Sequence, residues 1–108
     1  MKHSVSDEEI AVKYLALKNS AKDRNIEFGL TLSKLTKLMR QSRCYYSNVL
    51  FIDGDPIYSR SIDRVDNNKG YTDSNTVACT IKLNQKKGNL TIEEIELLYK
   101  GIQKFKEL

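Results

Sequence analysis

The sequence predicts a small α+β protein that forms one domain. Apolar residues recur at helical spacing near both ends of the chain, and a segment rich in aromatic and β-branched residues lies between them. The chain has 108 residues, of which 40% are hydrophobic and 30% are charged. This composition supports one modest core and is not that of a disordered protein.

The composition also excludes several classes of protein. No apolar run approaches the roughly 18 residues that span a bilayer, and the first ten residues turn acidic where a signal peptide would be apolar. Cys44 and Cys79 are too few for a disulfide framework or a four-thiolate zinc site, so we expect two free, partly buried thiols. These features predict a cytoplasmic protein with no membrane partner.

The first part of the chain predicts two helices. A capping box begins at Ser6, and the apolar residues that follow it predict a helix over about residues 7–22. Thr31 or Ser33 is expected to cap a second helix, which ends near Ser42.

The middle of the chain predicts a β-hairpin followed by a short helix. The run CYYSNVLFI, residues 44–52, is aromatic and β-branched, which is typical of a strand. A turn closes this run, and a second strand is expected over Arg60–Val65. After a polar loop, residues 76–87 are expected to enter as extended chain and to continue as a short helix that ends at Gly88 or Asn89.

The last segment, residues 91–108, predicts a helix that closes the domain. Thr91 and Glu94 have the spacing of a second capping box. The helix carries apolar residues on one face, namely Ile95, Leu98, Ile102 and Phe105. We expect this face to pack against apolar residues of the hairpin.

Residues 61–89 are the part of the chain best suited to chemistry. The net charge is +4, and the basic excess lies in the middle of the sequence, which favours an anionic partner. Asp63 and Asn84 offer oxygen ligands of the kind that Mg²⁺ binds. Lys86 and Lys87 follow Asn84 within one helical turn and are able to hold a phosphate backbone. Solvated lysines and turn-forming Asp and Asn residues would explain the same pattern.

The order of these motifs resembles the HNH endonucleases, the ββα-metal nuclease family, and especially its short phage-type members. The resemblance covers residues 21–89 and rests on Cys44-Tyr45-Tyr46, SIDRVDN at 61–67, Lys69-Gly70-Tyr71, Asn75, and Asn84 with Lys87 nearby. It implies an α+β fold in which residues 44–90 form an HNH-like ββα core. Residues 1–43 would be a helical lead-in with two helices, and residues 91–108 a C-terminal helix.

The resemblance implies a metal-dependent endonuclease that hydrolyses phosphodiester bonds in nucleic acid, in DNA more readily than in RNA. Asp63 would be an acidic ligand and Asn84 the second ligand of one divalent cation, with Mg²⁺ favoured and Mn²⁺ or Ni²⁺ as alternatives. Asn75 would fix the loop that orients the catalytic residue.

One position departs from the family pattern. Arg64 stands where active members carry the histidine that deprotonates the attacking water, and a guanidinium cannot be that base. Arg64 is therefore expected to bind a phosphate or to stabilise charge in the transition state. The sole histidine of the chain, His3, is expected to be a solvated terminal residue.

The same resemblance predicts the contacts with nucleic acid and the absence of a structural zinc. The expected contact residues are Arg64, Lys69, Tyr71, Lys86 and Lys87. Zinc-containing members carry paired Cys-x-x-Cys clips, whereas Ser47 stands three residues after Cys44, and Thr80 and Leu83 stand at the second clip.

The missing histidine keeps a second function class open. An HNH-fold protein without hydrolytic activity could bind nucleic acid or a partner protein, for example as a phage inhibitor of a host enzyme. A third option is an interaction domain that dimerises through its amphipathic terminal helix. In each case the expected setting is the cytoplasm of a phage-infected or prophage-carrying bacterial cell.

Overall fold

The computed structural model describes residues 5–108; His3 lies outside the described residues. The elements in chain order are α1 (Asp7–Asp23), β1 (Phe28–Gly29), α2 (Leu32–Arg40), β2 (Arg60–Arg64), β3 (Tyr71–Thr72), β4 (Thr76–Thr80), α3 (Ile81–Lys87) and α4 (Ile92–Lys106). The predicted α+β class is confirmed. Within residues 5–108 no helix has both the length and the hydropathy needed to cross a bilayer.

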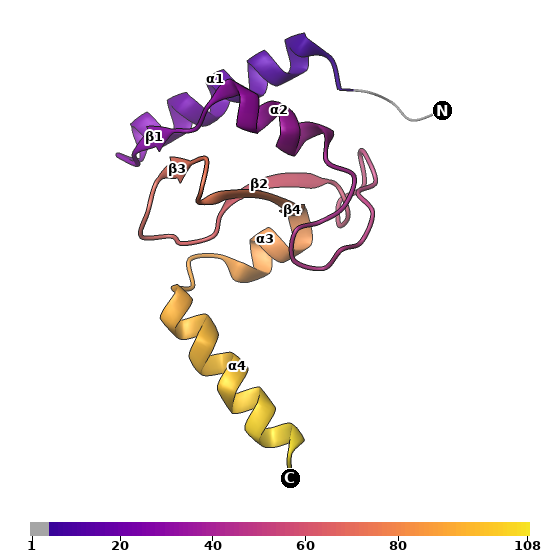
Figure 1. Cartoon of the computed structure of the whole chain (residues 1–108), viewed down its shortest axis with the longest axis vertical. Coiled ribbons are helices and arrows are strands. Elements are labelled where there is room, and N and C mark those ends of the chain that lie inside the picture. The colour runs from indigo at the N-terminus through magenta and orange to yellow at the C-terminus, as the bar shows by residue number, and fades with distance from the viewer. Residues whose placement is uncertain (1–4) are drawn as a thin grey trace.

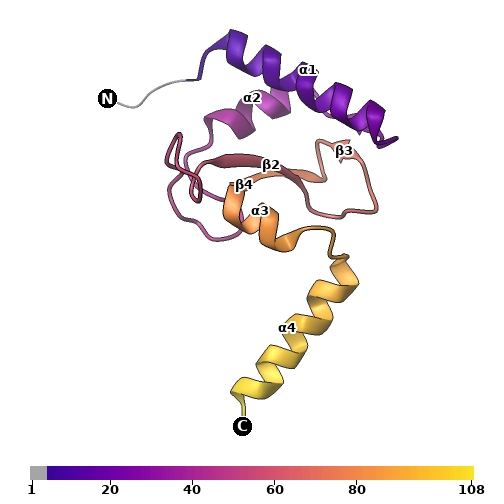
Figure 2. The ribbon, with the colours of Figure 1, turned by 180° about the vertical axis from the view of Figure 1, so that it is seen from behind.

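The antiparallel pair of β2 and β4 forms the centre of the fold. Arg60 lies opposite Thr80 and Arg64 lies opposite Thr76. Helices α1 and α2 lie on one side of this pair and α3 lies on the other (Figure 1). A shorter parallel pair joins β1 to β3. Seen from either side, α4 projects away from this layered body (Figures 1 and 2).

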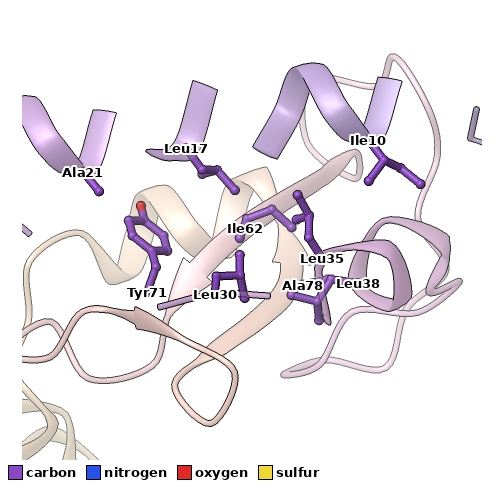
Figure 3. Packing of buried hydrophobic residues seen from close by; sticks show 9 residues of the cluster. All are labelled: Ile10, Leu17, Ala21, Leu30, Leu35, Leu38, Ile62, Tyr71 and Ala78. Atoms are coloured by element: carbon purple, nitrogen blue, oxygen red, sulfur yellow. The ribbon is translucent and has the colours of Figure 1, made fainter. Parts of the chain in front are cut away.

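The hydrophobic core lies between helices α1 and α2 and one face of the β2–β4 pair (Figure 3). Ile62 and Ala78 are cross-strand partners and both belong to this core. Because side chains alternate between the two faces of a strand, Ser61 and Asp63 point to the opposite face, toward α3. The core thus fixes the β2–β4 pair and leaves Ser61 and Asp63 to contact α3.

The predicted helices are confirmed, with small shifts at their ends. The Ser6 side chain accepts a hydrogen bond from the Glu9 backbone N–H at 3.1 Å and caps α1. Thr31, rather than Ser33, caps α2, which ends at Arg40. The capping box predicted at the start of α4 is fully formed.

The strand predicted over residues 44–52 is wrong. The Asn48 backbone N–H donates to the Cys44 carbonyl at 2.9 Å, and Asn48 adopts a φ of 62° in the left-handed region. Asparagine tolerates that conformation, so the run folds into a turn rather than a strand. Only an isolated bridge between Arg43 and Leu50 is formed there. The partner of β2 is therefore β4, from the segment expected to be extended, and not the preceding run.

The prediction that α4 packs on the hairpin is also wrong. No residue of α4 is buried, and Ile102 and Phe105 are 53% and 75% exposed. Helices α1 and α2 already cover the apolar face of the β2–β4 pair. The other face, from which Ser61 and Asp63 contact α3, is already occupied by that helix, so the β2–β4 pair has no free face for α4.

The chain packs closely around Gly70, just before β3 begins. A Cβ at Gly70 would collide with the backbone carbonyl and the Cβ of Glu27, whereas a Cβ at Gly29 would meet only Thr72 Cγ2 at 3.8 Å. We expect Gly70→Ala to lower the free energy of unfolding by about 1–3 kcal/mol. Gly29→Ala should change it by less than about 0.5 kcal/mol. Urea unfolding of both variants measures the difference, and equal midpoints would contradict the predicted collision.

Candidate functional site

The candidate site lies between β2 and α3. Helix α3 follows β4 without a loop, and the Thr80 side chain caps it by accepting from the Leu83 backbone N–H at 3.4 Å. Asn84 and Lys87 are three residues apart and therefore share one face of this short helix. That face meets Ser61 and Asp63, which are two residues apart on β2.

A buried ion pair joins Lys87 to Asp63. The Lys87 ammonium lies 3.4 Å from Asp63 Oδ1, and the two side chains are only 10% and 6% exposed. The same ammonium donates to the Arg64 carbonyl at 2.8 Å and to Asn67 Oδ1 at 3.5 Å. An ammonium has three N–H donors, and here each of them has an oxygen acceptor.

The second oxygen of Asp63 is also occupied. The Tyr46 hydroxyl donates to Asp63 Oδ2 at 2.7 Å. Burial, reinforced by this hydrogen bond to the carboxylate, raises the pKa of Tyr46 far above its ordinary value, so the hydroxyl stays protonated and keeps donating. Burial and the charge of Asp63 likewise raise the pKa of the Cys79 thiol to about 12, which keeps this cysteine neutral.

Asn84 is half-buried and bonds to the strand rather than facing Asp63 as a free ligand. Its side-chain amide donates to Ser61 Oγ at 2.6 Å. The contact between α3 and β2 thus consists of two polar pairs, Asn84 with Ser61 and Lys87 with Asp63.

This arrangement does not fit the expected divalent cation. Both oxygens of Asp63 already accept hydrogen bonds, and a metal ion beside this carboxylate would be repelled by the Lys87 ammonium. Mg²⁺ requires several oxygen ligands in near-octahedral geometry. Over residues 5–108 no group of three or more His, Cys, Asp or Glu side chains is placed to hold a metal ion.

Arg64 and Asn75 hold the loop between β2 and β3. Arg64 donates to the carbonyls of Asn67 and Lys69 at 3.1 and 3.0 Å. The buried Asn75 accepts from the Asp66 backbone N–H at 2.9 Å and donates to the Asp66 and Gly70 carbonyls at 3.1 and 2.9 Å. The Arg64 guanidinium is thus directed at the loop backbone, and a phosphate contact from it stays a prediction.

The expected nucleic-acid contacts separate into exposed and buried side chains. Lys69 and Lys86 are exposed. Tyr71 is only 6% exposed, and its ring packs 6.2 Å from that of Phe28, so this expected contact residue lies in the core and its contact with nucleic acid stays a prediction. The Lys87 ammonium is buried against Asp63, and its expected phosphate contact likewise stays a prediction.

Sequence reasoning missed Tyr46, Ser61 and Asn67 as partners in this site. Asn67 donates to the carbonyls of Gly88 and Leu90 at 3.2 and 2.9 Å and ties the loop to the segment after α3. These residues lie far from their partners in the sequence, so neither helical nor strand periodicity predicts the contacts. The available clue was that Tyr46, Ser61 and Asn67 belong to the motifs that carry the HNH resemblance.

An apolar groove of about 490 Å³ lies beside the ion pair, between α3 and the start of α4. Its lining residues are Tyr46, Val65, Leu83, Lys86, Lys87, Ile92, Ile95 and Glu96. Further along α4, beyond the groove lining, Leu98 is 55% exposed.

Comparisons with known proteins find viral relatives. No family model and no solved structure matches the chain. The chain is 34% identical over 79 residues to an uncharacterized 29.0 kDa protein of Enterobacteria phage T4, from the dda-modA intergenic region; the match covers 70% of this chain and 31% of that protein. It is 34% identical over 84 residues to the uncharacterized protein R423 of Acanthamoeba polyphaga mimivirus, covering 75% of this chain and 14% of that one. The chain therefore spans less than a third of these relatives' lengths.

The ion pair predicts unequal effects for two neighbouring lysines. Lys87→Met leaves the buried Asp63 carboxylate without its counter-charge, so we expect the free energy of unfolding to fall by about 3–5 kcal/mol. Lys86→Met removes the same charge from an exposed position and should change it by less than about 0.5 kcal/mol. Urea unfolding followed by circular dichroism measures both.

A double variant provides the control for this prediction. Adding Asp63→Asn to Lys87→Met removes the uncompensated charge and should recover part of the lost stability. Equal free energies of unfolding for Lys87→Met and Lys86→Met would show that the Asp63–Lys87 pair is not buried in solution.

Proposed function

We propose that this protein is a nucleic-acid-binding module of the HNH-like ββα type, which binds duplex DNA without hydrolysing it. One observation carries the proposal: the Lys87 ammonium lies against Asp63, where the family resemblance implies a divalent cation. Lys87 thereby supplies, within the chain itself, the positive charge that a metal would bring.

An ammonium replaces the charge of a metal but not its chemistry. It cannot activate a bound water or act as a Lewis acid on a phosphate oxygen. The position of the expected general base holds Arg64, which stays protonated and donates to the loop backbone. Residues 5–108 contain no histidine to take over that role. These features support binding over hydrolysis.

The exposed charges support nucleic acid as the partner. Lys82 and Lys86 are four residues apart on α3 and both are exposed, which places them on one outer face of the helix. Lys69 is exposed on the loop that Asn67 ties to the end of the same helix. Lysines grouped in this way contact phosphates and set position and affinity rather than sequence preference.

A metal-dependent endonuclease is the second candidate function. The observation that favours it is that Asp63 and Asn84 come from facing elements, β2 and α3, as the resemblance implies. Hydrolysis would require Lys87 to leave Asp63 for a phosphate and a cation, Mg²⁺, Mn²⁺ or Ni²⁺, to take its place. Asp63, Arg64 and Asn75 would then be the catalytic set.

The relatives support a viral setting for either function. Both are proteins of viruses, one of a phage and one of a mimivirus. We propose that the chain acts in the cytoplasm of an infected cell. A partner protein of the host is the alternative if nucleic acid does not bind.

Plasmid nicking and duplex binding, measured on the same preparation, separate these functions. We expect salt-sensitive binding of a fluorescent DNA duplex and no nicking of supercoiled plasmid with Mg²⁺, Mn²⁺ or Ni²⁺ beyond that seen in EDTA. Asp63→Asn, which keeps the shape of the side chain, is the control for contaminating nuclease. Metal-dependent nicking that Asp63→Asn abolishes would establish the endonuclease, and absence of both binding and nicking would refute both candidates.

The lysines predict a defined change in salt dependence. Lys69→Ala combined with Lys86→Ala should make the slope of log affinity against log salt shallower by about 0.9 for each lysine. Lys18→Ala combined with Lys22→Ala is the matched control, because these exposed lysines lie on α1, across the sheet from α3 (Figure 1). Equal slopes for the two double variants would contradict a phosphate-binding surface at α3.

A further inference from the structure

Helix α4 carries an apolar surface that nothing in residues 5–108 covers. Leu98, Ile102 and Phe105 recur at helical spacing and are 55%, 53% and 75% exposed. Leu97 and Tyr99 widen this surface and are 70% and 62% exposed. We refer to these five residues as the α4 face. A contiguous exposed apolar surface of this kind marks an interaction site.

The charges of α4 indicate what covers the α4 face. Its first half carries Glu93, Glu94 and Glu96, and its second half carries Lys100, Lys104 and Lys106. A second copy of the helix that runs antiparallel would lay its basic half along the acidic half of the first. A parallel copy would place like charges level with each other. The charge pattern is thus self-complementary in the antiparallel arrangement alone.

The apolar residues match the same arrangement. If a two-fold axis crosses the pair at Lys100, residues equally far from the axis lie level with one another. Leu98 then meets Ile102 of the second copy, and Ile95 meets Phe105. Ile95 lines the apolar groove beside α3, so Phe105 of the second copy would reach the mouth of that groove.

Gly101 is a further sign of close approach. Glycine is a poor residue for the middle of a helix, and a Cβ at Gly101 would meet nothing within 4 Å among residues 5–108. Packing among these described residues therefore gives no reason for a glycine here. It lies three residues after Leu98 and four before Phe105, on the border of the α4 face, where a missing side chain lets a second helix come near.

We infer that two copies of this protein associate through their α4 helices, packed antiparallel across the α4 face. Helix α4 has 15 residues and is about 22 Å long, so the contact is small and the dimer should be a weak one, formed at micromolar concentrations or above. This inference does not depend on the proposed function, because α4 carries none of the residues of the β2–α3 site.

Sedimentation velocity of the full chain from micromolar to near-millimolar concentration tests the association. We expect a monomer–dimer equilibrium that Ile102→Glu weakens at least about tenfold. Gln103→Glu introduces the same charge on the polar side of α4 and should leave the equilibrium unchanged. Since no residue of α4 is buried, Ile102→Glu should keep the fold, which circular dichroism verifies.

A cross-linking measurement tests the orientation. Chains carrying Leu98→Cys and chains carrying Ile102→Cys are mixed and oxidised mildly, with the wild type as control for its buried cysteines. The antiparallel pair predicts that the disulfide joins one chain of each kind. A wild type that stays monomeric, a dimer that survives Ile102→Glu, or disulfides that join only identical chains would each overturn the inference.

Discussion

The structure depends on the buried ion pair of Asp63 and Lys87. The Lys87 ammonium contacts Asp63 and the Arg64 carbonyl, both on β2, and the side chain of Asn67 in the following loop. One charged group thus links β2, this loop and α3. A buried charge is tolerated only when its partners are in place. Each of these three segments is therefore held in the position that satisfies the others, and Asn67 extends the linkage to the turn that leads into α4.

The β2–β4 pair has two faces of different chemistry, and this difference organises the remainder of the molecule. Ile62 and Ala78 give α1 and α2 an apolar surface to cover, while Ser61 and Asp63 give α3 a polar one. Because α3 already covers this second face, the pair has no free face for a further helix. The apolar surface of α4 therefore stays exposed within residues 5–108, and the inferred association with a second copy would cover it.

The same ion pair governs the proposed function. A ββα unit that holds a metal can hydrolyse a phosphodiester, whereas one that holds an ammonium keeps the positive charge without the Lewis acid. The resemblance to HNH endonucleases therefore supports the proposed binding of nucleic acid more directly than it supports catalysis. In this proposal the exposed Lys69 and Lys86 are the contact residues, whereas Lys87 and Tyr71 are buried.

The sequence by itself determined the helices, because caps such as Ser6 and Thr91 and apolar spacing act over one or two turns. It also predicted β2 and the extended entry into α3. Only the tertiary structure decided that β2 pairs with β4, that Tyr71 belongs to the core and that α4 stands free. It also decided that Lys87 faces Asp63 and not solvent. Strand pairing and burial depend on contacts between segments that are far apart in the sequence. The burial of apolar surface and the pairing of buried charges select these contacts, and both act only when the whole chain is folded.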